Sequence, residues 1–187
     1  MFGTLYEMGR LHLPHGAHVL EVGCAEDDWM TPMLAARPDL QLTGIDWRGC
    51  DRPGTLIRGD VLVHDFPEAS FDAVVGISSI EHIGLGHYNQ DPLDDDGDRH
   101  CMERIVRWLK PGGWVYADVP YDPDRYEVHG TAYRTYDDRA LADRLLVPGL
   151  VERQRWFCSL HAPRTITREC PPTIQSMRIV MLVAEKA

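Results

Sequence analysis

Three carboxylates end or follow three successive apolar runs, and their spacing suits one shared ligand. Glu21 lies in HVLEVGC, Asp46 ends LQLTGID, and Asp60 follows TLIRG. A carboxylate about 20 residues beyond the loop that follows a first strand can accept hydrogen bonds from both hydroxyls of a ribose. A carboxylate after the third run can accept from the exocyclic amine of adenine. The three side chains together therefore predict a nucleoside site.

The loop after Gly23 decides between a nucleoside and a nucleotide. It carries Glu26, Asp27 and Asp28, whereas a pyrophosphate needs bare N–H groups and no anions at the start of a helix. A carboxylate suits a neutral ribose but repels a diphosphate. We therefore expect a nucleoside without phosphates, and the acidic surroundings also suit a positive charge on it.

The segment SSIEHIGLGHYNQDPLDDDGD, residues 78–98, holds groups suited to acid–base or metal chemistry, and three interpretations are open. It contains two histidines and six acidic residues but neither Lys nor Arg. In the first interpretation, Glu81 and His82 fix the loop by hydrogen bonds, and the Asp cluster is a solvated turn that caps the next helix. In the second, His82 or His87 is a general base towards a substrate hydroxyl. In the third, Glu81, His82 and an Asp or distant His bind Mg²⁺ or a similar ion.

A second group of polar side chains, in EVHGTAYRTYDD, is a candidate wall on the substrate side. His129, Tyr133, Arg134 and Tyr136 offer hydrogen-bonding and stacking groups; the alternative is a loop that simply leads into the next helix. Residues 125–178 carry nine basic and six acidic side chains, whereas residues 81–98 carry the six acidic ones noted above. This asymmetry suits an acidic substrate or a partner subunit, although a solvated surface is the preferred explanation.

Strand and helix patterns alternate along the chain from about residue 17. Apolar runs predict strands at 17–22, 40–46, 55–61, 71–78, 114–120, 151–160 and 176–184. Helical periodicity predicts helices at 29–37, 99–110 and 137–147. Asp27 or Asp28 is the expected cap of the first helix, and the Pro-Gly-Gly of residues 111–113 is expected to end the second.

This alternation is typical of βαβ units, with helices on both faces of a parallel sheet. We therefore expect an α/β fold with one domain over residues 1–187. Its sheet is predicted to be doubly wound, Rossmann-like, mostly parallel and seven-stranded, with an antiparallel last strand. In such sheets ligands bind beyond the carboxyl ends of the strands, where the strand order reverses. The three carboxylates and the segment 78–98 all fall at such ends.

Five motifs resemble those of class I S-adenosylmethionine-dependent methyltransferases. EVGCAED is similar to their first motif, which is usually an acidic residue followed by x-Gly-x-Gly-x-Gly. TGIDW resembles their ribose-binding strand end, and RGDV their adenine-contacting loop. FDAVVGISSIEHI resembles their fourth-strand motif, and LKPGGWVYADVP the segment from a helix to the fifth strand. The motifs cover about residues 17–121 in the family's order, with one departure: Gly23 is kept, but Ala25 and Asp27 stand at the next two glycine positions.

The resemblance implies S-adenosylmethionine as the cofactor, bound by the half of the chain from about 17 to 121. Trp47 would pack against the adenine. Substrate-side elements would lie at about 82–98, 121–137 and 160–175. The implied cofactor-binding residues are Glu21, Gly23, Ala25, Asp46, Trp47, Asp60, Val61 and Ser78.

The stretch around Glu81 resembles further groups of methyltransferases. Small methyltransferase-like proteins associated with polysaccharide or natural-product pathways carry a similar Ser-x-Glu-His-Ile-Gly-Leu-Gly stretch. Glu-His is also similar to that of quinone-pathway methyltransferases and small-RNA 2′-O-methyltransferases, some of which hold a divalent metal with Glu-x-x-Glu-His. Ser78 stands here where that pattern has its first Glu, so Glu81 and His82 are an incomplete metal set.

Composition and motifs disfavour several other functional classes of protein. The net charge of −10 over 187 residues disfavours a broad nucleic-acid-binding face. Five scattered cysteines without a C-x-x-C pair, no signal-peptide pattern and no run long enough to span a bilayer favour a cytoplasmic protein without a membrane partner. A nicotinamide oxidoreductase would need Gly-x-Gly-x-x-Gly, of which Gly23 alone is present.

We therefore predict a biosynthetic transferase that methylates an oxygen, rather than a nitrogen, of a small polar acceptor such as a sugar or natural-product intermediate. The catalytic candidates are Glu81, His82 and His87. A second copy of the chain, forming a homodimer, could complete the acceptor site. The alternatives are a non-catalytic binding or partner protein with the same fold and an RNA 2′-O-methyltransferase.

Overall fold

A computed structural model describes residues 13–25, 30–49, 51, 53–87, 93–159, 166–170 and 177–187 of the chain. Several predictions fall outside these ranges: the helix caps Asp27 and Asp28, the acidic Asp91, and most of the expected substrate element 160–175. In the described ranges, no helix combines the length and the apolar character that crossing a bilayer requires.

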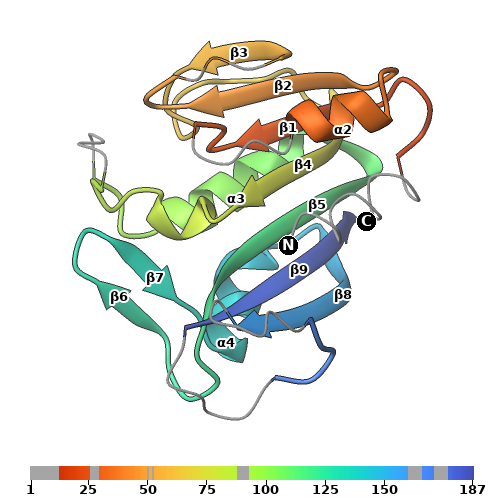
Figure 1. The fold of residues 1–187 in the computed structure, drawn as a ribbon. Coiled ribbons are helices and arrows are strands. Elements are labelled where there is room, and N and C mark those ends of the chain that lie inside the picture. The colour runs from red at the N-terminus through yellow and green to blue at the C-terminus, as the bar shows by residue number, and fades with distance from the viewer. Residues whose placement is uncertain are drawn as a thin grey trace.

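Seven strands form one sheet in the order β3-β2-β1-β4-β5-β9-β8 (Figure 1). They are β1 (His18–Val22), β2 (Gln41–Asp46), β3 (Thr55–Arg58), β4 (Phe71–Ile77), β5 (Leu109–Tyr121), β8 (Leu150–Ser159) and β9 (Arg178–Lys186). β1 to β5 are paired in parallel, and β9 is antiparallel to both β5 and β8. The predicted mostly parallel sheet with an antiparallel last strand is confirmed. Because the strand order reverses between β1 and β4, a ligand crevice is expected at their carboxyl ends.

The burial of each strand explains its place in the sheet. β4 reads FDAVVGI, and every residue except Asp72 is buried. The first seven residues of β9 are likewise buried. Such strands need cover on both faces and therefore lie inside the sheet. β3 reads TLIR, has no fully buried residue, and forms an edge.

Helices cover both faces of the sheet. α2 (Met30–Ala36) lies on one face, and α3 (Gly97–Trp108) lies on the other (Figure 1). α4 (Asp138–Ala140) and its π-helical continuation η2 (Leu141–Leu145) pack on the face of α3. The Asp137 carboxylate caps α4 by accepting from the Ala140 backbone N–H at 2.7 Å. η1 (Ile80–His82), a 3₁₀ turn, is separated from the end of β4 by two residues.

One predicted boundary is wrong. The Pro-Gly-Gly stretch does not separate a helix from a strand, because β5 begins at Leu109, immediately after α3, and includes it. Leu109 pairs with Phe71, and the register then shifts before Trp114 pairs with Ala73. This irregularity in the ladder accommodates the extra residues, since proline cannot donate to a ladder and is tolerated at irregular positions.

The segment after β5 forms a hairpin rather than a plain loop. β6 (Glu127–His129) and β7 (Tyr133–Thr135) pair in an antiparallel two-stranded sheet. Its three-residue turn contains Gly130 with a φ of +60°, which favours glycine. Figure 1 shows this hairpin projecting beside the carboxyl end of β5. It forms one wall near the strand ends.

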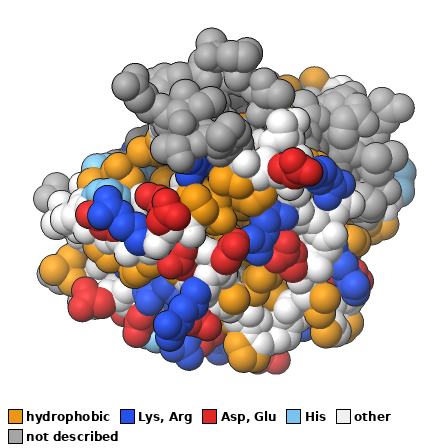
Figure 2. Space-filling model, turned by 90° about the horizontal axis from the view of Figure 1, so that it is seen from below, with side chains coloured by type: hydrophobic (Ala, Val, Ile, Leu, Met, Phe, Trp, Pro, Cys, Tyr) orange, Lys and Arg blue, Asp and Glu red, His pale blue; other side chains and the backbone are white. Residues whose placement is uncertain are grey.

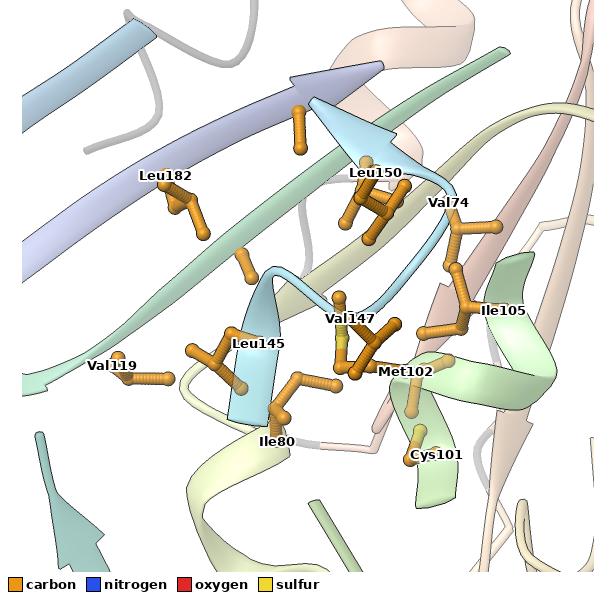
Figure 3. Packing of buried hydrophobic residues seen from close by; sticks show 14 of the residues in the cluster. Val74, Ile80, Cys101, Met102, Ile105, Val119, Leu145, Val147, Leu150 and Leu182 are labelled. Atoms are coloured by element: carbon orange, nitrogen blue, oxygen red, sulfur yellow. The ribbon is translucent and has the colours of Figure 1, made fainter. Parts of the chain in front are cut away.

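The larger hydrophobic core lies between the sheet and α3. Met102 and Ile105 of α3, Leu145 of η2, Val74 of β4 and Leu182 of β9 belong to one buried cluster (Figure 3). Burial of each side chain of this size contributes about 1.5–3 kcal/mol. A sheet held in this way fixes the strand ends, where the candidate site lies.

Candidate cofactor-binding and acid–base site

A cavity opens at the carboxyl ends of β1, β2, β3 and β4, at the predicted switch point. It is lined by Val22, Gly23, Ile45, Asp46, Trp47, Arg48, Gly59, Val61, Ile77, Ser78, Ser79, His82 and Ile83. Five predicted cofactor residues and the catalytic candidate His82 therefore lie together. The cavity volume is about 70 Å³, whereas small-molecule pockets usually measure about 300–1,000 Å³. A ligand of nucleoside size therefore extends beyond this enclosed space or displaces side chains as it enters.

The backbone requires glycine at Gly23, the first loop residue after β1. Its φ is +82°, and a Cβ at this position would overlap the Ser79 side chain. Two residues later, the Ala25 backbone N–H donates to Asp46 Oδ2 at 3.1 Å. Asp46 therefore orients this loop while it also lines the cavity.

Both oxygens of the predicted ribose acceptor, Asp46, are engaged by Arg48. Oδ1 accepts from the Arg48 backbone N at 2.8 Å and from Nε at 3.1 Å, and Oδ2 accepts from Nη2 at 3.2 Å. The Asp46 side chain is 5% exposed and that of Arg48 32%. Trp47, between them in the sequence, is exposed and lines the cavity. Arg48 is thus the side chain whose displacement would open the carboxylate.

The other two predicted carboxylates lie deeper than expected. Glu21 is buried in β1, and Asp60 is buried after β3. Neither is among the described residues that line the cavity. Asp60 Oδ1 accepts from the Leu62 backbone N–H at 2.8 Å and so shapes the turn that carries Val61 into the cavity wall. Of the three carboxylates, only Asp46 is placed to meet a ligand directly.

His82 is held in one orientation by the β6–β7 hairpin. Its Nδ1 lies 2.5 Å from the Ala132 carbonyl oxygen. Because a carbonyl only accepts hydrogen bonds, Nδ1 must carry the proton, and in the neutral ring the lone pair is then on Nε2. The His87 ring stacks on His82 with centroids 5.0 Å apart. His82 lines the cavity, so a candidate base faces the cofactor crevice.

Glu81 lies beside His82 but is buried. Its Oε1 is 3.8 Å from His82 Nε2. Burial, together with the nearby Asp118 carboxylate, raises the pKa of Glu81 well above the ordinary value. A magnesium ion would therefore have to be bound with the Glu81 carboxyl group ionised against this burial. The described residues also contain no group of three or more His, Cys, Asp or Glu side chains arranged to hold a metal ion.

Ser78 makes a strained turn at the end of β4. Its φ of +44° is unusual for a residue other than glycine. Asp118 of β5 stabilises this turn, because its Oδ1 accepts from Ser78 N at 2.8 Å and from Ser78 Oγ at 3.1 Å. Asp118 is the charged residue inside the apolar run WVYADVP, and its role in this structure is to hold the turn that follows β4.

Arg134 and Tyr136 do not face a substrate, which corrects the prediction. Both are fully buried. Arg134 Nη1 donates to the Ile83 carbonyl at 2.7 Å, and Arg134 Nε lies 3.6 Å from Asp98 Oδ1. Tyr136 donates to Asp98 Oδ2 at 2.7 Å. These contacts hold the segment that follows β4 in position.

Asp98 is likewise not part of a solvated turn. It is fully buried and forms an ion pair with Arg144 at 2.6 Å in addition to its contact with Arg134. Asp94, at the other end of the cluster, accepts from His100 Nδ1 at 2.6 Å. Much of the charge asymmetry expected from the sequence is therefore neutralised inside the fold.

His129 and Tyr133 lie together, but in a second cavity. Their rings stack with centroids 4.5 Å apart, and His129 Nε2 lies 2.9 Å from Thr135 Oγ1. Residues of the hairpin alternate between its faces, so these side chains point away from the face that carries Arg134. Figure 2 shows basic and acidic side chains interspersed on the side seen from below, where the described residues form no broad area of one charge.

Comparisons with known proteins agree with this architecture. A family model described as "Caenorhabditis protein of unknown function, DUF268" matches residues 62–149. No curated protein sequence matches the chain significantly.

Three solved structures illustrate the structural likeness. The [4+2]-cyclase SpnF superposes with a TM-score of 0.70 at 17% identity, covering 98% of this chain and 80% of its own. The 1,6-didemethyltoxoflavin-N1-methyltransferase of Burkholderia thailandensis, solved with S-adenosylhomocysteine, gives 0.68 at 17% identity, covering 100% and 76%. The N-methyltransferase NodS of Bradyrhizobium japonicum WM9 gives 0.64 at 17% identity, covering 99% and 93%.

The likeness extends over nearly the whole of this chain and includes a sheet that continues from parallel strands into an antiparallel β9. At this level of identity, the comparison establishes the fold. The chain has the fold of the class I S-adenosylmethionine-dependent methyltransferases.

Proposed function

We propose that the chain binds S-adenosylmethionine at the strand-end cavity and methylates an oxygen of a small polar acceptor, such as a sugar or natural-product intermediate. The observation that carries this proposal is the position of His82. Its ring lines the same cavity as Asp46 and is oriented by the Ala132 carbonyl. A carboxylate that binds the cofactor and a base that accepts the proton would then lie in the same cavity.

The residues present fit the cofactor. Asp46 offers a buried carboxylate at a strand end, where ribose hydroxyls can donate to it once Arg48 moves. Gly23 leaves room that a Cβ would fill. Trp47 presents an exposed ring that can pack against adenine. When bound, S-adenosylmethionine would supply a methyl group carried on a positively charged sulfur, and the electron pair of the methyl–sulfur bond would stay on sulfur.

The protein must then accept a proton. As the acceptor oxygen bonds to the methyl group, its own hydrogen leaves, and His82 Nε2 carries the lone pair that takes it. The Ala132 carbonyl stabilises the imidazolium that results, because Nδ1–H continues to donate to it. Positioning supplies the rest of the rate, since the sulfonium is already activated.

A nitrogen acceptor is the second candidate. Two of the structurally similar proteins are N-methyltransferases by name. An amine needs a base only to lose its ammonium proton before attack, so an N-methyltransferase depends less on His82 above the pKa of the amine.

The test is methyl transfer from labelled S-adenosylmethionine to a panel of sugars, phenols and amines. His82→Gln should lower kcat on the best hydroxyl acceptor by about 10²–10⁴-fold and leave S-adenosylhomocysteine binding unchanged. His15→Gln, at an exposed residue before β1, is the matched control. Wild-type turnover of an amine alone would favour the second candidate, and full activity of His82→Gln on a hydroxyl would contradict the proposed base.

A further inference from the structure

A second cavity lies between the outer face of the β6–β7 hairpin and the start of β9. Its volume is about 270 Å³. His129, Tyr133 and Thr135 line it from the hairpin, and Tyr121 and Arg178 line it from the sheet. Among the described residues, none lines both this cavity and the crevice that contains Asp46, so its ligand need not be the cofactor.

Arg178 is the unusual residue in this cavity. As the first residue of β9, it pairs with Tyr121 and Ser159 in the ladder and is only 9% exposed. Its Nε is buried without a hydrogen-bond partner. Throughout the described part of the chain, no carboxylate forms an ion pair with Arg178. A buried cationic group without an acceptor on one of its N–H groups is costly, and an anion held by the rest of the guanidinium would offset part of that cost.

Three carboxylates, those of Asp122, Asp124 and Glu127, also line this cavity. Arg125 lies 2.9 Å from Glu127 and 4.0 Å from Asp122, and all three side chains are at least one-third exposed. Asp122 also accepts from the Asp124 backbone N–H at 3.0 Å. These acidic side chains form a solvated rim, whereas Arg178 lies at the buried end. The rim offers acceptors for hydroxyl groups and disfavours a doubly charged phosphate.

Two aromatic side chains define the shape of the ligand. The stacked rings of His129 and Tyr133 form a flat wall at an interplanar angle of 27°. The face of a sugar or other ring can lie against such a wall. The guanidinium is a planar fork that matches a carboxylate with two parallel hydrogen bonds.

We propose that this cavity binds a hydroxylated ring compound carrying one carboxylate, such as a sugar acid, with Arg178 holding the carboxylate. The ring lies against His129 and Tyr133, and the rim accepts hydroxyl hydrogens. The site does not depend on the cofactor, so its failure and that of the proposed methyl transfer are separable.

Binding calorimetry without cofactor tests the proposal with three probes: galacturonate, galactose and glucose 6-phosphate. Wild type should bind galacturonate at least tenfold more tightly than either other probe. Arg178→Met, which keeps the apolar stem, should remove the preference, and Arg178→Lys should retain part of it. Arg153→Met, at a half-exposed arginine paired with Glu185 on the neighbouring strand, should leave it intact.

Equal wild-type affinity for galacturonate and galactose, or no binding of either, would overturn the proposal without any variant. A preference for glucose 6-phosphate would also overturn it, because the ligand would then be a phosphate. If Arg178→Met proves unfolded by circular dichroism, wild-type ¹H NMR decides instead: galacturonate must shift the ring resonances of His129 and Tyr133, and galactose must not.

Discussion

Replacing Arg48 by methionine should tighten the binding of S-adenosylhomocysteine. Arg48 engages both oxygens of Asp46, at 3.1 Å and 3.2 Å from its side chain, and ribose hydroxyls need those same oxygens. Methionine keeps the apolar stem and removes the competing charge. The Arg48 backbone N–H, which also donates to Asp46, is unaffected.

The magnitude follows from the exposure of the ion pair. Arg48 is 32% exposed, and partly exposed ion pairs contribute about 0.2–1 kcal/mol. Removing the competitor should therefore improve Kd by up to about fivefold, since about 1.4 kcal/mol corresponds to tenfold. Salt provides a second signature because it screens the pair. Wild-type affinity should rise between about 0.05 M and about 0.5 M salt, whereas that of Arg48→Met should stay level.

Titration calorimetry of both proteins at the two salt concentrations measures these effects. Arg99→Met removes an exposed arginine that is paired with Glu103 on α3 and does not line the cavity, and it is the matched control. Weaker binding by Arg48→Met would refute the reasoning, because Arg48 would then contact the ligand rather than compete with it.

Three further predictions concern residues around the site. Arg134→Met should lower the free energy of unfolding in urea by about 3–5 kcal/mol, because it removes a cation from the buried Asp98 carboxylate; a loss below about 1 kcal/mol would mean that Arg144 alone satisfies Asp98. Gly23→Ala should weaken S-adenosylhomocysteine binding at least tenfold in calorimetry, because of its positive φ and the overlap with Ser79; unchanged affinity would show that the loop is not part of the site. Folding raises the pKa of Glu81 above its ordinary 4.5, so stability is highest below that value and is lost as pH rises towards the raised pKa. Glu81→Gln removes this loss, and its Tm relative to wild type should rise between about pH 5 and about pH 8; a parallel pH dependence would contradict the burial argument.

The sequence predicted site residues correctly where a single apolar run fixes both the strand and the residue at which the strand ends. Asp46 terminates an apolar run, so both its strand and its place at the sheet edge were predictable. Gly23 and Trp47 were placed by the same reasoning. The alternation of strand and helix patterns also predicted the mostly parallel sheet.

The sequence was uninformative where two distant segments meet. Arg134 and Tyr136 have the composition of a binding wall, but the hairpin turns them inward onto Asp98, 36 residues earlier for Arg134. His82 is oriented by a backbone carbonyl, that of Ala132, which no side-chain pattern can reveal. Arg48 was overlooked because its position on Asp46 depends on side-chain geometry rather than on spacing.

The most direct test of the central claim is calorimetric binding of S-adenosylhomocysteine to wild type, Asp46→Ala and Asp65→Ala, the last at an exposed carboxylate after β3. If the cavity at the strand ends is the cofactor site, wild type and Asp65→Ala bind equally, and Asp46→Ala loses at least tenfold, about 1.4 kcal/mol. Equal affinity in all three proteins, or no binding by wild type, would contradict the account.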